Sequence, residues 1–169
     1  MSTDLSQSLN PLRLARAGEN LEGSIPLDTM TRVADLLLVN EGEINYCLSF
    51  TTKDSGLCVI ESEIIGCLSL KCQRCLKPVV INICKQTQLG VVNNKDELEF
   101  LEKEYEPFLL NEGVFNVKEL VEDELLLAIP LSPLHPVEQC PGTKELDRIN
   151  ADGKLNPFAV LASLKKDKT

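Results

Sequence analysis

The sequence predicts an α+β fold in which an antiparallel β-sheet, curled toward a barrel, is covered by one amphipathic helix. Three observations lead to this fold class. Three β-like runs follow one another in the first half of the chain, a capped helix with one apolar face occupies residues 117–129, and 169 residues are enough to bury the core of one domain. We therefore expect a single domain over residues 1–169, with residues 1–10 and 141–155 loose or linker-like.

The three runs predict consecutive strands joined by tight connections. Residues 43–52 alternate between apolar and polar side chains, which is typical of a half-buried strand. Residues 53–56 form a turn, and residues 57–71 predict a long second strand. Residues 79–92 are rich in β-branched side chains and predict a third strand. The stretch between the second and third strands is then the tip of a hairpin.

The clearest helix signal begins at Asn116, a side chain suited to cap a helix. Glu119 lies three residues later, as in a capping box, and Pro130 ends the segment. The apolar positions fall on one helical face, and Glu119, Glu122 and Asp123 predict a solvated opposite face. We therefore expect this helix to pack on the sheet.

The remaining segments give weaker signals. Residues 1–20 show no convincing period, and residues 141–154 have the composition of a loop or linker. The other expected elements are an extended segment over 21–27, a short helix over 28–36, helical turns within 93–106, an extended segment over 108–110 and a terminal helix over 158–164.

The charge distribution disfavours a general nucleic-acid binder, because the net charge of −9 repels a phosphate backbone. Residues 93–150 carry fourteen acidic residues against five basic ones. This asymmetry predicts either a solvated face or an acidic surface for a basic protein partner. A basic patch within residues 71–85 is the predicted contact for RNA or a partner, and it contains Lys71, Arg74, Lys77 and Lys85.

The composition also indicates the compartment. The amino terminus lacks the pattern of a secretory signal, and no apolar run approaches the roughly 20 residues that span a membrane. Seven cysteines, an odd number, do not indicate a disulfide scaffold. We expect a cytoplasmic protein with reduced thiols and no membrane partner.

Four side chains form a candidate metal site. Cys72 and Cys75 are two residues apart at the expected hairpin tip, and His135 and Cys140 lie in a proline-rich stretch. Together they make a complete Cys3His set for one tetrahedral zinc ion. The alternatives are structural thiols, or a redox dithiol, although a redox motif usually opens a helix and this pair lies between strands.

The other thiols and the single histidine give no catalytic signal. Cys47, Cys58, Cys67 and Cys84 lie within predicted strands, so we interpret them as packing residues. His135 lacks a partner in a catalytic motif, and no phosphate-binding loop or nucleophile elbow is present. We therefore expect no enzymatic activity.

Five motifs occur in order along the chain, at residues 70–75 (Leu-Lys-Cys-Gln-Arg-Cys), 105–107, 121–130, 133–140 and the closing stretch 156–165 (Asn-Pro-Phe-Ala-Val-Leu-Ala-Ser-Leu-Lys). Together they resemble the YceD-like family of large-subunit ribosomal RNA accumulation proteins. The resemblance runs from about Asn10 to the end of the chain.

The resemblance implies a bacterial cytosolic protein that acts in the synthesis, processing or stability of 23S ribosomal RNA. The family supplies no catalytic residues to carry over. Many relatives have a second cysteine pair where this chain has His135 and Cys140, a departure that still leaves four ligands. We therefore expect a non-enzymatic ribosome-biogenesis factor whose acidic face meets a basic ribosomal protein or assembly factor. The alternatives are direct RNA binding through residues 71–85 and thiol redox activity.

Overall fold

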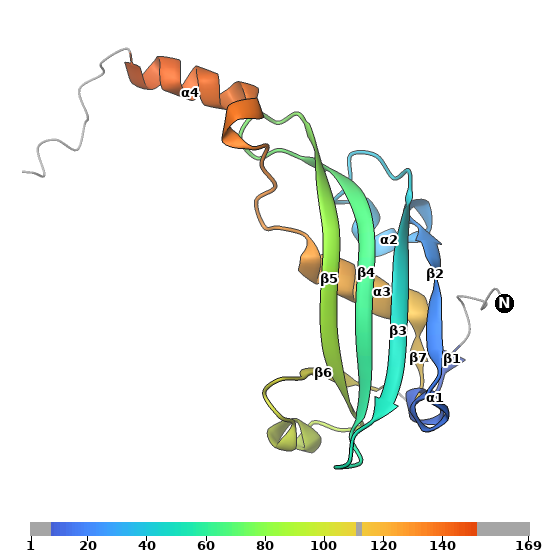
Figure 1. The fold of residues 1–169 in the computed structure, drawn as a ribbon. Helices are drawn as coiled ribbons and strands as arrows, with labels where there is room; N and C mark the ends of the chain where they lie inside the picture. Colours follow the sequence, from blue (N-terminus) through green and yellow to red (C-terminus); the bar gives the residue numbers. More distant parts are fainter. Residues whose placement is uncertain (1–7, 111–112, 152–169) are drawn as a thin grey trace, which may run out of the picture.

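The computed structural model describes residues 8–110 and 113–151 (Figure 1). In chain order the elements are β1 (Ser8–Leu9), α1 (Pro11–Ala17), β2 (Asn20–Pro26), η1 (Leu27–Thr29), α2 (Thr31–Ala34), β3 (Glu43–Thr52), β4 (Cys58–Lys71), β5 (Pro78–Val92), η2 (Asp96–Phe100), β6 (Glu106–Leu109), β7 (Phe115–Asn116), α3 (Val117–Ala128), η3 (Val137–Gln139) and α4 (Pro141–Ala151). None of the helices in these ranges is long and apolar enough to cross a membrane.

The main sheet has five strands in the order β2-β3-β4-β5-β6. The first three pairings are antiparallel, as expected, but β6 lies parallel to β5. The chain between β5 and β6 makes the 3-10 turn η2 and comes back alongside the end of β5 in the same direction (Figure 1). A separate two-stranded sheet joins β1 to β7.

The sheet stays open, so the expected curl into a barrel is not found. Closing a barrel would require the outermost strands to pair with each other. In the described part of the chain β2 pairs only with β3, and β6, four residues long, pairs only with β5. The mixed α+β class is confirmed, with antiparallel pairing predominant.

One face of the sheet packs against the helices. The alternation in β3 and β4 places Phe50 and Ile64 on this face, where both are fully buried. Helix α3 crosses behind the sheet in Figure 1 and inserts Val121 and Leu125 into the same core. The predicted cap is confirmed, because the side-chain oxygen of Asn116 accepts hydrogen bonds from the backbone N–H groups of Lys118 and Glu119 at 2.8 and 3.2 Å.

The polar face of α3 is less solvated than predicted. Glu122 and Glu124 are each only 3% exposed. Glu122 accepts hydrogen bonds from the backbone and side chain of Arg32. Glu124 accepts a 2.7 Å hydrogen bond from the hydroxyl of Thr87 and lies 2.9 Å from Nζ of Lys85. The prediction of a solvated face was wrong at Glu122, because α2 supplies a partner that helical spacing alone does not reveal.

Three other predictions need correction. Residues 11–17, which show no convincing period, form α1 with Asn10 as its cap. Residues 8–9 are not loose, since they pair with β7. The segment predicted as a loop over 141–154 is helical from Pro141 to Ala151, because a proline is favourable in a first turn and the following residues tolerate a helix. The predicted helix over 158–164 lies outside the described residues.

The interpretation of four cysteines as packing residues holds only in part. Cys58 is buried and Cys47 is half-buried. Cys67 and Cys84 are exposed. These two lie on the face of the sheet that the helices do not cover, because strand alternation turns them away from the buried Leu68 and Ile83.

Candidate metal centre

The first half of the site is the connection between β4 and β5. Lys71 pairs with Pro78, so the chain reverses direction within residues 72–77. The backbone N–H of Cys72 donates to the carbonyl of Lys77, and the N–H of Leu76 donates to the carbonyl of Cys72, both at 2.9 Å. Leu76 has a φ of 60°, a left-handed conformation that closes the turn. This knuckle presents both thiols on one side of the tip.

The second half is the proline-rich segment after α3. The carbonyl of Pro133 accepts a 2.8 Å hydrogen bond from the backbone N–H of Gln73. Nε2 of His135 lies 2.9 Å from the carbonyl oxygen of Pro78. Two backbone positions of the knuckle therefore fix the path of this segment, which brings its histidine to the cysteine pair.

The beginning of α4 completes the site. The N–H of Thr143 donates to the carbonyl of Cys140 at 3.0 Å, and Nη1 of Arg74 donates to the hydroxyl of Thr143 at 2.7 Å. A Cβ added at Gly142 would lie 3.1 Å from the carbonyl oxygen of Arg74 and 3.2 Å from the Cβ of Cys75. The absence of a side chain at Gly142 thus allows Cys140 to approach the knuckle.

The structure brings the four predicted ligands together. One ligand atom from each of Cys72, Cys75, His135 and Cys140 lies within 4.8 Å of the other three. Cys72 and Cys140 are 0% and 1% exposed, and Cys75 and His135 are half-buried. The cluster can hold a metal ion and largely exclude water from it.

The orientation of His135 suits a ligand. A carbonyl oxygen only accepts hydrogen bonds, so Nε2 carries a hydrogen in the contact with Pro78. In the neutral ring Nδ1 then keeps its lone pair, and it lies 3.4 Å from Sγ of Cys75. Histidine ligands in metalloproteins are commonly fixed in this way by a carbonyl on the opposite nitrogen.

Even without a metal, the cluster favours a thiolate at Cys72 and a protonated imidazole at His135. Burial disfavours the Cys72 thiolate, but hydrogen bonds from the backbone of Cys75, His135 and Arg74 outweigh burial and lower its pKa to about 5. Hydrogen bonding to Cys72 raises the pKa of His135. Burial also opposes ionisation of Cys140, yet the N–H of Gly142 and neighbouring groups lower its pKa.

Cys75 behaves differently from the other two thiols. A hydrogen bond from the backbone of Lys77 favours its thiolate, but burial and the neighbouring Cys72 and Cys140 raise its pKa. Like charges close together disfavour ionisation of the next group, so a cation at the centre would be needed to hold all three as thiolates.

The donor set fits zinc. Bonds of about 2.3 Å to sulfur and about 2.0–2.1 Å to nitrogen place tetrahedral ligand atoms roughly 3.5–3.8 Å apart. The 3.4 Å between Sγ of Cys75 and Nδ1 of His135 already matches this spacing, and the limit of 4.8 Å for the set requires only small movements. Three sulfurs and one imidazole nitrogen are also ligands that zinc prefers to magnesium or calcium.

The four basic residues predicted as a contact patch do not form one surface. Lys71 and Lys77 are exposed on the knuckle. The half-buried Arg74 bonds Thr143 of α4. Lys85 lies on the helix-covered face and forms its ion pair with the buried Glu124.

Sequence reasoning missed the residues that support the ligands. The carbonyls of Pro78 and Pro133 orient the knuckle and the histidine, and Gly142 and Thr143 seat the start of α4. The prolines indicated a stiff segment, but a carbonyl acceptor leaves no signal in sequence. Gly142, two residues after the last cysteine, was the one available sign of a close backbone approach.

Comparison with known proteins identifies the family. The family described as large ribosomal RNA subunit accumulation protein YceD matches residues 60–165, a range that includes all four candidate ligands. The large ribosomal RNA subunit accumulation protein YceD of Haemophilus influenzae is 30% identical over 168 residues, covering 96% of this chain and 97% of the relative. No solved structure gives a significant match. The chain therefore belongs to the YceD family of large ribosomal RNA subunit accumulation proteins.

Proposed function

We propose that the protein is a non-enzymatic ribosome-biogenesis factor that acts in the synthesis, processing or stability of 23S ribosomal RNA. The observation that carries the proposal is the family membership, supported by similarity over 96% of the chain to a relative named for accumulation of the large ribosomal RNA subunit. A binding role also suits the described residues, because their cluster of three thiols and one imidazole could hold a metal ion.

In this proposal Cys72, Cys75, His135 and Cys140 hold one structural zinc ion. The ion would neutralise the thiolates and join the β4–β5 tip to the segment that follows α3. Four protein ligands leave no open coordination position, which is typical of structural rather than catalytic zinc. The role of the metal is then to shape the end of the molecule.

The protein partner in this proposal is basic. The chain has a net charge of −9, and most of its acidic excess lies in the second half. Ribosomal proteins and assembly factors that bind RNA are commonly basic, so opposite charge would accelerate their encounter with this protein. The complex should weaken as salt screens this attraction.

Direct RNA binding is the second candidate, and the exposed Lys71 and Lys77 on the knuckle favour it. Charge reversal at these two residues tests it without disturbing the contacts of Arg74 and Lys85. Loss of RNA binding with a steep salt dependence would support this candidate.

Thiol redox activity is the third candidate, because the low pKa of Cys72 is shared by redox thiols and metal ligands. A reactive thiol must also be accessible, and Cys72 is 0% exposed. Burial therefore favours the metal ligand.

A deletion strain tests the proposed function. We expect 23S ribosomal RNA to fall relative to 16S when the gene is removed and to recover when the wild-type gene is restored. Northern analysis of precursor and mature species would distinguish synthesis from processing. Unchanged 23S levels and unchanged precursors would overturn the proposal.

A further inference from the structure

Within residues 8–110 and 113–151, the helices leave one face of the main sheet uncovered. Residues from α1, α2 and α3 join a single core on the other face, represented by Leu14, Val33 and Leu125. In Figure 1 the uncovered face is turned toward the viewer, with α3 behind the strands. We call the uncovered side of β2–β5 the outer face.

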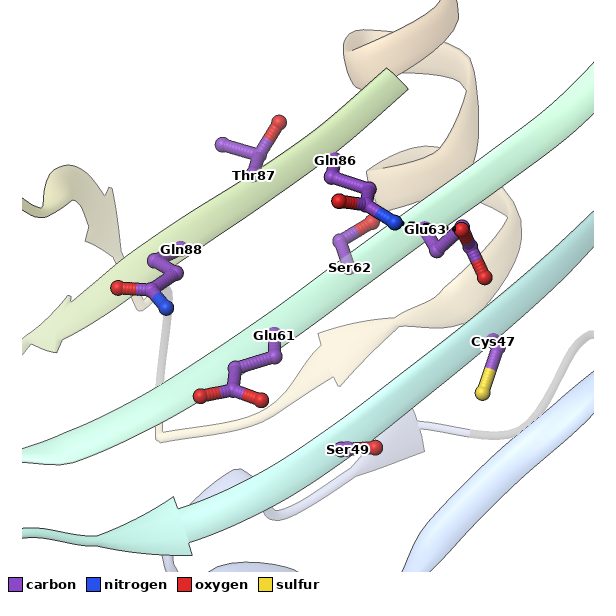
Figure 2. A pocket seen from close by; sticks show the side chains of 8 residues that line it. All are labelled: Cys47, Ser49, Glu61, Ser62, Glu63, Gln86, Thr87 and Gln88. Carbon is purple, nitrogen blue, oxygen red and sulfur yellow. Dashed lines mark hydrogen bonds between the residues drawn. The ribbon is translucent and has the colours of Figure 1, made fainter. Parts of the chain in front are cut away.

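The outer face contains two adjoining hollows of about 470 and 480 Å³. Cys47 and Glu63 line both, so the hollows form one trough across the sheet. Figure 2 shows the first hollow, with Glu61 and Glu63 projecting from β4 beside Gln86 and Gln88 from β5.

Strand register arranges the side chains of the trough in rows. Glu22, Cys47, Glu63 and Gln86 lie opposite one another on four adjacent strands. Glu61 lies in the neighbouring row, between Ser49 on β3 and Gln88 on β5. Residues two apart on a strand are separated by about 6.5–7 Å. This spacing equals the repeat of same-side side chains in an extended peptide lying along the sheet.

The charge of the trough has one sign. Glu22, Glu61 and Glu63 supply its charged groups, and no lysine or arginine of residues 8–110 and 113–151 lines it. Glu63 accepts a 2.7 Å hydrogen bond from Gln86. Glu22 and Glu61 are exposed and make no hydrogen bond or ion pair with the described part of the chain. A surface that is only solvated usually mixes both signs.

The segment before β6 extends this acidic surface. A Cβ added at Gly90 would lie 2.5 Å from Leu101 and 3.2 Å from Tyr105, so the bare backbone of β5 allows these side chains to cross the outer face. Glu104, Glu102 and Glu61 together raise the pKa of the Tyr105 hydroxyl, chiefly through a hydrogen bond to Glu104. The trough therefore runs toward a segment that carries further carboxylates, together with the exposed Lys103 and with Lys53, whose Nζ lies 6.0 Å from the centre of the Tyr105 ring.

We infer that the outer-face trough binds an extended, arginine- or lysine-rich segment of a protein partner, with Glu61 and Glu63 receiving alternate basic side chains. This inference rests on the proposed function and places the surface for the basic partner on β4 and its neighbours, outside the acid-rich residues 93–150. Carboxylates at a two-residue repeat match the guanidinium groups of an extended chain, which can bind each carboxylate through two hydrogen bonds. The polyanionic backbone of RNA is repelled by the same groups.

Peptide binding to the full-length protein tests the inference. The probe is a fluorescent peptide with arginine and serine in alternation, measured by anisotropy at low and physiological salt. The double substitution Glu61→Gln and Glu63→Gln should weaken binding about tenfold, since two charged contacts at or near the surface are lost. The matched control, Asp28→Asn with Asp35→Asn on η1 and after α2, makes the same change in net charge at exposed positions away from the trough.

NMR spectroscopy tests whether the peptide binds in the trough. In NMR spectra the side-chain amides of Gln86 and Gln88 should shift when the peptide is added. Equal weakening by the two double variants, or a single-stranded RNA that binds more tightly than the peptide and shifts the same amides, would overturn the inference. An unchanged 23S level in the deletion strain would refute the proposed function instead, so the two failures are distinguishable.

Discussion

Nδ1 of His135 lies 3.4 Å from Sγ of Cys75, a residue 60 positions earlier in the chain. The contact depends on the β4–β5 register, which sets the knuckle, and on the carbonyl of Pro78, which fixes the imidazole. A metal bound here would therefore couple the hairpin tip to the segment after α3.

Substitution Cys140→Ser should abolish stable zinc binding. The loss should exceed the roughly 10–100-fold that removal of an outer-shell partner costs, because Cys140 would be a direct ligand. Elemental analysis and native mass spectrometry measure the bound metal, and a chelator should lower the melting temperature of the wild type but not of the variant. Cys84→Ser, at an exposed cysteine outside the cluster, is the control and should retain the metal. Equal metal content in both variants would contradict the site.

In the metal-free protein one cysteine should ionise at a pH well below the pKa of about 8.5 of a free cysteine. The pKa of Cys72 is about 5, so its deprotonated form appears as the pH rises through that value. Ultraviolet absorbance of the thiolate measures this step, which should be missing in Cys72→Ser. If the first thiolate of the wild type forms only near pH 9, the hydrogen bonds inferred for Cys72 are absent.

Substitution Lys85→Met should destabilise the fold by about 2–3 kcal/mol, because Glu124 would remain buried without its charged partner. Urea unfolding measures the change. Adding Glu124→Leu should recover part of the loss, since the uncompensated carboxylate is then removed. Lys77→Met is the control and should change stability by less than about 0.5 kcal/mol, because Lys77 is exposed. A Lys85 variant as stable as this control would show that the ion pair contributes nothing.

Removal of the α3 cap gives a smaller effect. Asn116→Ala leaves the N–H groups of Lys118 and Glu119 without their acceptor and should cost about 1 kcal/mol. Chemical unfolding of this variant is compared with Asn40→Ala, an exposed position between α2 and β3. A loss no larger than that of the Asn40 variant would mean that tertiary packing alone holds the start of α3.

Periodicity and local chemistry were sufficient to predict β3, β5 and α3. Residues 43–52 alternate strictly, residues 79–92 are rich in β-branched side chains, and Asn116 offers a local cap. The same reasoning missed α1, whose seven residues are too short to show a period, and α4, whose apolar positions are few. It also predicted that Glu122 is exposed to solvent, because its partner Arg32 lies 90 residues away in the sequence.

Local sequence specifies the ligand types, the sharp turn between two long strands, the helix that begins after Asn116 and the acidic net charge. These features depend on neighbours within a few positions, where side-chain periodicity and backbone propensity act. Three features emerge only from the folded chain: four candidate ligand atoms within 4.8 Å of one another, the pairing of Lys85 with Glu124, and the parallel direction of β6 and β5. Each of these depends on contacts between distant segments, whose positions are fixed by strand register and core packing rather than by local sequence.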